Sequence, residues 1–218
     1  MFHKVSFSSA ELGVFSGLQV SADSSDASSP IIGMDGVILP SIHRPRGPMP
    51  VVMIMETSDI DDGLALLTLL ADARVTLKAL VVSPGTNEQV GLVKAMLEPF
   101  GLSHIPIGKA GGKGGAESVS DPYRSAYRNF KPAKKGDIQD GGAVLKTYCD
   151  SSTTLVCGAS PKVVSETIKK HGKSFEVGEL VMQGGFAGKT VVPDEFQLDK
   201  FKDMTTCTSF NFGTNPKN

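Results

Sequence analysis

Three carboxylates stand close together early in the chain: Asp59, Asp61 and Asp62 follow directly on the apolar run VVMIME (51–56). Such a run is typical of a strand buried on both faces of a parallel sheet, and open parallel sheets bind ligands at the carboxyl ends of their strands. Crowded carboxylates repel one another unless a cation or a shared proton compensates, and their hard oxygen atoms suit calcium or magnesium. The segment therefore predicts a metal site. The alternative is a plain helix start, in which the acids only favour the helix dipole.

Polar side chains also follow the next apolar run, in VVSPGT (81–86). Ser83, Thr86 and Asn87 could reach a ligand from there, because the carboxyl ends of parallel strands share one edge of the sheet. The alternative is an ordinary turn followed by a helix whose capping residue is Asn87.

Two later segments carry weaker signals. MQGGFAG (182–188) has paired glycines, which let a ligand or a neighbouring backbone approach closely, but it lacks the GxxxxGK[ST] spacing of a phosphate-binding loop. Asn211, in TSFNFGTNP (208–216), offers donors and an acceptor that match sugar hydroxyls. Its alternative role is that of a turn residue.

The elements that must position these residues alternate along the chain. Apolar runs and their flanking glycines and prolines predict strands at 51–56, 77–83, 105–108, 153–158 and 178–185. Helical spacing predicts helices at 61–72, 87–101, 141–149 and 161–172, with residues 109–140 as a long loop or insertion. This alternation indicates an α/β fold, an open parallel sheet with helices on both faces.

Composition narrows the class of protein. The chain has 218 residues and a net charge of −1, so charge favours neither nucleic acid nor an anionic membrane as partner. No apolar run is long enough to span a bilayer. Three cysteines without CxxC spacing argue against a disulfide framework and a zinc site, and favour a cytoplasmic setting.

Residues 1–48 differ in composition from the rest. They are rich in serine and proline, which predicts a flexible extension before a domain that covers 49–218. A role in organelle targeting stays open, although the segment contains acids that transit peptides usually lack.

Five segments, in this order, together resemble the inosine/uridine-preferring nucleoside hydrolase family. They are METSDIDDGLAL (55–66), VVSPGTNEQVGLVKAML (81–97), LVCGASPKVV (155–164), ELVMQGGFAG (179–188) and SFNFGTNPK (209–217). The resemblance implies a parallel-sheet α/β domain, often assembled as dimers or tetramers. It also implies hydrolysis of the N-glycosidic bond of a small-molecule ribonucleoside, with calcium as cofactor.

The resemblance also implies roles for individual residues. Asp62 would bind calcium together with Asp61, and Asp61 would accept a hydrogen bond from a ribose hydroxyl. Asp61 and Asp59 are the candidates for proton transfer. Asn211 would hold the ribose, and Asn87 and Glu195 are further candidates for substrate binding.

The sequence departs from the family pattern at several positions. The aspartate expected as metal ligand and base falls on Thr57, and Ser209 replaces the glutamate near Asn211. Glu56 is expected to point to the opposite face of the strand. The chain ends at Asn218, where the family continues with a C-terminal third that supplies a further aspartate and a histidine.

These departures leave three hypotheses. The chain is part of a nucleoside hydrolase truncated at its C-terminus, or an inactive relative that keeps at most weak ribose or metal binding. The third is an unrelated α/β domain that binds a nucleotide or a partner protein.

Overall fold

The computed structural model describes residues 31–32, 38–39, 47–111, 119–185, 194–202, 204, 207 and 209–213. The chain divides into two units, one comprising Val5–Pro48 and the other Met1–Lys4 with Met49–Asn218. In the first unit, β1 (Ile31–Ile32) pairs antiparallel with β2 (Ile38–Leu39). The flexibility predicted for residues 1–48 concerns mostly residues outside the described part, so it stays a prediction.

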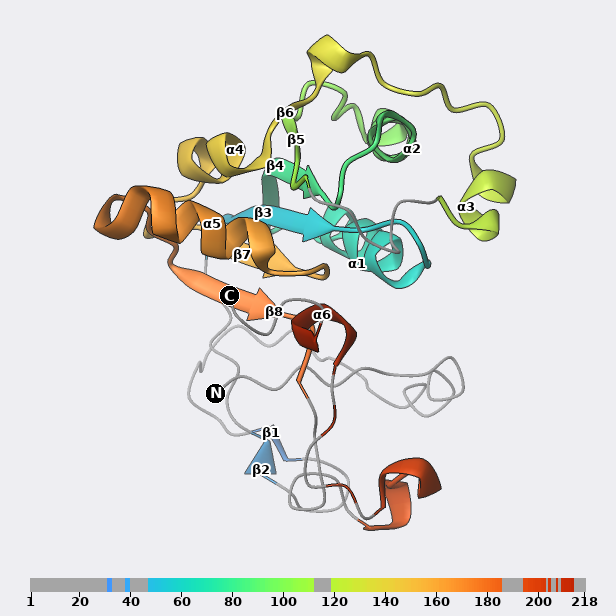
Figure 1. The fold of residues 1–218 in the computed structure, drawn as a ribbon, viewed down its shortest axis with the longest axis vertical. Coiled ribbons are helices and arrows are strands. Elements are labelled where there is room, and N and C mark those ends of the chain that lie inside the picture. Colours follow the sequence, from blue (N-terminus) through green and yellow to red (C-terminus); the bar gives the residue numbers. More distant parts are fainter. Residues whose placement is uncertain are drawn as a thin grey trace. The chain divides into compact units, whose positions relative to one another are not determined.

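The second unit is built on a six-stranded sheet in which every neighbouring pair of strands is parallel. Its strands are β3 (Met49–Met55), β4 (Val75–Val82), β5 (Ile107–Lys109), β6 (Gln139–Asp140), β7 (Thr154–Cys157) and β8 (Glu179–Met182). Their order in space is β6-β5-β4-β3-β7-β8 (Figure 1). The predicted strands and the predicted parallel α/β sheet are confirmed.

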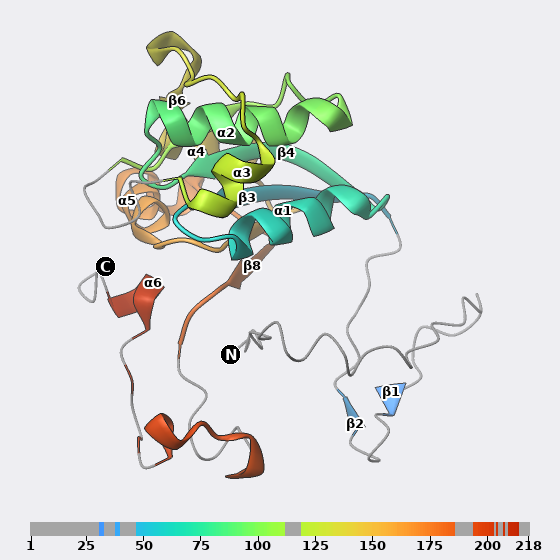
Figure 2. The ribbon, with the colours of Figure 1, turned by 90° about the vertical axis from the view of Figure 1, so that its right-hand side faces the viewer.

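Helices cover both faces of this sheet, as predicted (Figure 2). They are α1 (Asp61–Ala71), α2 (Asn87–Leu97), α3 (Asp121–Ala126), α4 (Gly141–Tyr148), α5 (Lys162–His171) and the short α6 (Phe210–Gly213). Single 3₁₀ turns lie at Glu98–Phe100, Lys135–Asp137, Gly172–Ser174, Asp194–Phe196 and Asp199–Phe201. No described helix is both long enough and apolar enough to cross a membrane.

The central strand β3 is buried on both faces because alternate residues feed two separate cores. Val51, Met53 and Met55 pack with residues of α1, α2 and α3. Val52 and Ile54 pack on the other side with residues of α4 and α5. The two cores hold the carboxyl end of β3 firmly in the middle of the sheet, where the first candidate site begins.

Two local predictions are wrong. Thr86, and not Asn87, caps α2: the Thr86 side chain accepts from the Gln89 backbone amide, and the Gln89 side chain accepts from the Thr86 amide. This reciprocal capping box satisfies two backbone donors at once, which the single cap expected from Asn87 would not. Residues 109–140 are not simply a loop either, because they contain α3 and β6.

Candidate functional site

The candidate site lies at the point where the order in which strands are added to the sheet reverses. The chain moves outward from β3 to β4, β5 and β6, and then returns to the other side of β3 with β7 and β8. The carboxyl ends of β3 and β7 therefore flank a topological switch point, the usual ligand crevice of open α/β sheets. Glu56 follows β3, Gly158 follows β7 and Gln183 follows β8 at this edge.

Three carboxylates meet at the switch point. One oxygen from each of Glu56, Asp61 and Asp62 lies within 4.8 Å of the others, a spacing that could hold a metal ion. Asp62 and Glu56 are buried, at 1% and 6% exposure, while Asp61 is exposed and opens the cluster to solvent. Three close carboxylates, two of them buried, are unfavourable unless positive charge or protons balance them, so the cluster favours a cation.

Hydrogen bonds orient each of the three carboxylates. The Glu56 amide donates to Asp62 Oδ2 over 2.9 Å, and the Ser58 amide donates to Glu56 Oε2 over 2.6 Å. Asp61 accepts from its neighbour's amide, Asp62 N, over 2.8 Å and from Gln183 Nε2 over 2.8 Å. Glu56 Oε2 also accepts from the Ser58 hydroxyl. A carboxylate has about four acceptor sites on its two oxygens, so these bonds orient the carboxylates and are compatible with a role as metal ligands.

Gly158 lets the end of β7 approach Asp62 closely. A Cβ atom at this position would lie 1.8 Å from Asp62 Oδ1, far inside van der Waals contact. The Gly158 amide donates to the Ile54 carbonyl over 2.9 Å, so the glycine is held at the switch point by the sheet itself. A side chain here would displace the buried carboxylate, which makes Gly158 part of the site's geometry.

Asp59 lies at the edge of the cluster and not among its three members. The Asp61 amide donates to Asp59 Oδ1 in a long bond of 3.4 Å. A side-chain hydrogen bond with Asp61, then partial burial, then repulsion from Asp61 and Glu56 raise the pKa of Asp59 to about 7. A carboxyl with this pKa exchanges a proton near neutral pH, the property that a general base or acid needs.

The prediction for Glu56 is wrong, because this residue belongs to the cluster. The alternation of side chains holds only inside a strand, and β3 ends at Met55. Beyond that residue the backbone turns into the loop, and the Glu56 amide hydrogen-bonds Asp62 instead of a neighbouring strand. An acid directly after a buried strand is the signal that could have identified it. Nothing local could have pointed to Gln183, which contacts Asp61 from 122 residues away.

In the segment after β4, the side-chain amide that contacts the β3–α1 loop belongs to the buried Gln89 and not to the exposed Asn87. Gln89 is fully buried, and its Nε2 donates to Thr57 Oγ1 over 3.0 Å, while its Oε1 accepts from the amides of Gly85 and Thr86. This network ties the β4–α2 turn to the β3–α1 loop. Asn87, the predicted substrate contact, is exposed at the first position of α2.

The two candidates from the C-terminal part of the chain are Asn211 and Glu195, and the structure brings Asn211 to the carboxyl ends of β7 and β8. Its side chain is buried, and Nδ2 donates to the carbonyls of Gly158 and Gln183 over 2.6 and 3.1 Å. The protein thus uses the amide nitrogen of Asn211 to join the ends of β7 and β8. Glu195 is exposed and lies in the 3₁₀ turn Asp194–Phe196. Gly184 and Gly185 are the paired glycines of the sequence, and Gly184 allows the ring of Phe212 to approach closely, as expected for such a pair.

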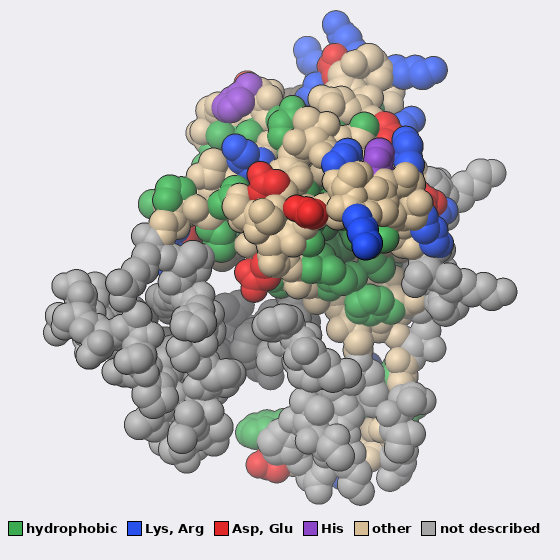
Figure 3. All heavy atoms as spheres, turned by 90° about the vertical axis from the view of Figure 1, so that its left-hand side faces the viewer, with side chains coloured by type: hydrophobic (Ala, Val, Ile, Leu, Met, Phe, Trp, Pro, Cys, Tyr) green, Lys and Arg blue, Asp and Glu red, His purple; other side chains and the backbone are tan. Residues whose placement is uncertain are grey.

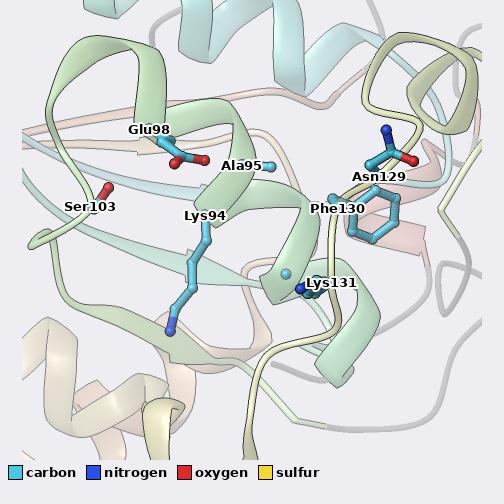
Figure 4. Close-up of a pocket in the computed structure, with 8 residues that line it drawn as sticks. Lys94, Ala95, Glu98, Ser103, Asn129, Phe130 and Lys131 are labelled. Atoms are coloured by element: carbon cyan, nitrogen blue, oxygen red, sulfur yellow. The ribbon is translucent and has the colours of Figure 1, made fainter.

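A separate hollow of about 470 Å³ lies on the outer side of α2 and contains none of these residues. Lys94 of α2 and Glu98 of the 3₁₀ turn that follows it line the hollow together with Asn129 and Lys131 (Figure 4). Lys94 pairs there with Asp137 over 3.0 Å. It has no crowded carboxylates, so the switch point remains the candidate for chemistry.

Comparisons with known proteins agree with this geometry at the level of the fold. No protein-family model matches the sequence. An uncharacterized protein of Aquifex aeolicus (strain VF5) is 28% identical over 172 residues, which cover 78% of this chain and 56% of that protein. A solved plant nucleoside hydrolase, PpNRh1, superposes with a TM-score of 0.52 at 17% identity, over 66% of this chain and 51% of the plant chain.

The effector protein XOO4466 superposes with a TM-score of 0.50 at 16% identity, over 79% of this chain and 51% of that chain. The chain thus spans about half the length of the proteins that it matches. Its sheet, its strand order and its two helical layers make it an α/β domain with a nucleoside hydrolase-like fold.

Proposed function

We propose that this chain carries the carboxylate half of a nucleoside hydrolase site, which cleaves the N-glycosidic bond of ribonucleosides with the assistance of calcium. The observation that carries the proposal is the cluster of Glu56, Asp61 and Asp62 at the switch point of a nucleoside hydrolase-like sheet. The expected substrates are inosine- and uridine-type ribonucleosides, in keeping with the family that the sequence resembles.

The donor set fits a calcium ion. Calcium takes six to eight oxygen ligands in flexible geometry, and carboxylates supply one or two each. Asp62 and Asp61, the predicted ligands, would hold the ion together with Glu56. When bound, calcium lowers the pKa of a coordinated water and so makes it a better nucleophile.

The protein's own groups supply the remaining chemistry. Asp59, with a pKa of about 7, is the proposed proton acceptor, and Asp61 is the proposed partner of a ribose hydroxyl. Asn211 is the proposed ribose contact, and its two hydrogen bonds to carbonyls fix its position at the strand ends. Asn87 and Glu195 remain proposed substrate contacts on exposed segments, and a cytoplasmic setting and homo-oligomers remain part of the proposal.

A second candidate function is binding without turnover. It is favoured by Thr57, which occupies the position where the family resemblance calls for an acidic metal ligand. Thr57 is fully buried and its hydroxyl accepts from Gln89 Nε2, so a neutral hydrogen bond replaces the charge there. In this reading the carboxylate cluster binds a cation and a ribose but does not cleave the nucleoside.

A reducing-sugar assay separates the two functions. The full 218-residue chain is incubated with inosine or uridine, in calcium or in a chelator. Hydrolysis predicts ribose release that requires calcium and that Asp62→Ala abolishes, while Glu166→Gln, which removes an exposed carboxylate from α5, retains it. Calcium binding without ribose release from either nucleoside would show that these 218 residues alone do not hydrolyse nucleosides, and would support the binding function.

A further inference from the structure

The hydroxyl of Tyr123 is buried without a clear structural partner in the described part of the chain. Tyr123 lies on α3 and is 5% exposed, with its ring in the core formed by α1, α2 and one face of the sheet. Its Oη is completely buried, yet it makes no hydrogen bond within the described part of the chain. A buried hydroxyl without a partner destabilises the fold, so a phenylalanine would serve the core better than this tyrosine.

This hydroxyl lies beside the carboxylate cluster. A Cβ atom on Gly63 would lie 1.9 Å from Tyr123 Oη, and Gly63 directly follows Asp62. Burial raises the pKa of Tyr123 well above its ordinary value, and repulsion from Asp62, Glu56 and Asp61 adds to the rise. The Gly63 amide is close enough to oppose the shift, but it does not use the phenol's own proton. Among the described residues, the phenol O–H is thus an unsatisfied buried donor next to a site rich in acceptors.

Ser120, three residues before Tyr123, carries a second buried hydroxyl without a partner among the residues that the structure describes. Its Oγ is also buried without a hydrogen-bond partner in the described part of the chain, although Ser120 stands at the cap position of α3. The Ser120 amide donates to the Thr57 carbonyl over 3.0 Å, which places it against the β3–α1 loop. Ser120 thus lies against the loop that follows β3, and the Tyr123 hydroxyl lies against Gly63 at the start of α1.

We infer that Tyr123, assisted by Ser120, is a ligand-binding residue of the carboxylate site, with its hydroxyl donating a hydrogen bond to an oxygen of the bound sugar. This inference rests on the proposed function and extends it to α3, a helix outside all five segments of the family resemblance. The carboxylates can only accept hydrogen bonds from a sugar, and the α3 hydroxyls add the donors that the sugar oxygens need.

The test compares Tyr123→Phe with wild type and with Tyr127→Phe, a matched change on a half-buried tyrosine that packs against the same core. The probes are calcium alone, and D-ribose in saturating calcium, each titrated and followed by thermal shift. D-ribose is the product of the proposed reaction, so turnover does not interfere. Tyr123→Phe should leave the calcium dissociation constant unchanged and raise that for ribose roughly three- to tenfold. Ser120→Ala should act in the same direction, and Tyr127→Phe should change neither constant.

The metal-free protein gives an independent readout. Because the Tyr123 hydroxyl has no partner, Tyr123→Phe should melt at the same temperature as wild type or higher. A clear drop would mean that the hydroxyl serves the fold, and this would overturn the inference. Equal ribose binding by wild type and Tyr123→Phe would overturn it as well. A wild-type chain that binds calcium but no ribose would instead contradict the proposed function itself, and the inference with it.

Discussion

Asn211 Nδ2 donates to the Gly158 carbonyl over 2.6 Å, joining α6 to the end of β7 across 53 residues of sequence. The same amide nitrogen donates to the Gln183 carbonyl at the end of β8 over 3.1 Å. One side chain thus links two strand ends whose residues both touch the carboxylate cluster. Gly158 abuts Asp62, and Gln183 donates to Asp61.

Replacing Asn211 by alanine should therefore loosen the C-terminal segment from the sheet. The change leaves two carbonyls without their donor, at a cost of about 1–3 kcal/mol. Urea unfolding should show this loss, and limited proteolysis should cut after Gln183 faster than in wild type. Asn129→Ala, at an exposed asparagine, is the control and should behave like wild type. Equal protease resistance of both variants would contradict the role given to Asn211.

Gly158→Ala should damage the metal site and the fold together. Its Cβ would lie 1.8 Å from Asp62 Oδ1, so the buried carboxylate or the end of β7 must move. We expect a loss of about 1–3 kcal/mol in unfolding free energy, the usual cost of forcing an extra methyl into a packed site, and weaker calcium binding. Gly136→Ala meets no atom within 4 Å and should leave both quantities unchanged. Calcium affinity that survives Gly158→Ala would argue against Asp62 as a ligand.

Calcium should raise the melting temperature of the chain. A ligand that binds only the folded state stabilises it, and a weak site of this kind calls for concentrations up to the millimolar range. Asp62→Ala should abolish the shift, and Glu56→Gln should reduce it, because both residues belong to the cluster. Glu166→Gln should keep it. A full shift in Glu56→Gln would remove Glu56 from the ligand set, and no shift in wild type would exclude a calcium site.

The stability of the metal-free protein should fall as the pH rises through the range in which Asp59 ionises. Its folded pKa of about 7 lies above the ordinary value of 3.8, so the protonated form is favoured by folding. The stabilisation is fully present below about pH 4 and is lost as the pH passes 7. In a chelator, melting temperatures from pH 5 to 8 should fall more steeply in wild type than in Asp59→Asn. Asp199→Asn, at a fully exposed site, should follow wild type. Parallel curves for all three would show that Asp59 is not perturbed.

The chain should self-associate in solution. Ile60 and Leu64, at the start of α1, are 43% and 55% exposed, and Phe210 is 67% exposed. β8 has no second neighbour among the described strands, and open strand edges and apolar patches promote association. Hydrophobic side chains also reach the surface beside charged ones on the face in Figure 3. Size-exclusion chromatography with light scattering should give a mass above 22.9 kDa, and Leu64→Gln should lower it. A monomer at all concentrations would contradict this.

The local pattern of the sequence was sufficient for most of the helices and strands and for their order along the chain, but α3 and β6 were not predicted. Short continuous apolar runs such as Val51–Met55 are typical of buried strands, and helical segments between them indicate crossovers, so the sequence predicts a parallel α/β sheet. The pair Asp61 and Asp62 could be placed at the site for the same reason, because a strand end and a helix start are both visible in the sequence. The sequence left two interpretations of Asp61 and Asp62, a metal site and a plain helix start. The two are compatible, because both acids lie in the first turn of α1 and also in the carboxylate cluster.

Only the tertiary structure decided which other groups join these two acids. Glu56 enters the cluster because β3 ends one residue earlier, and strand ends are not defined by side-chain alternation. Gln183, Gly158 and Asn211 arrive through strand order and packing, from positions far along the chain. Tyr123 lies in a segment that the sequence suggested to be a loop, and its buried hydroxyl beside Gly63 becomes visible only when α3 is packed against α1. Periodicity reports which face of an element is buried, whereas the meeting of side chains depends on how the faces pack against one another.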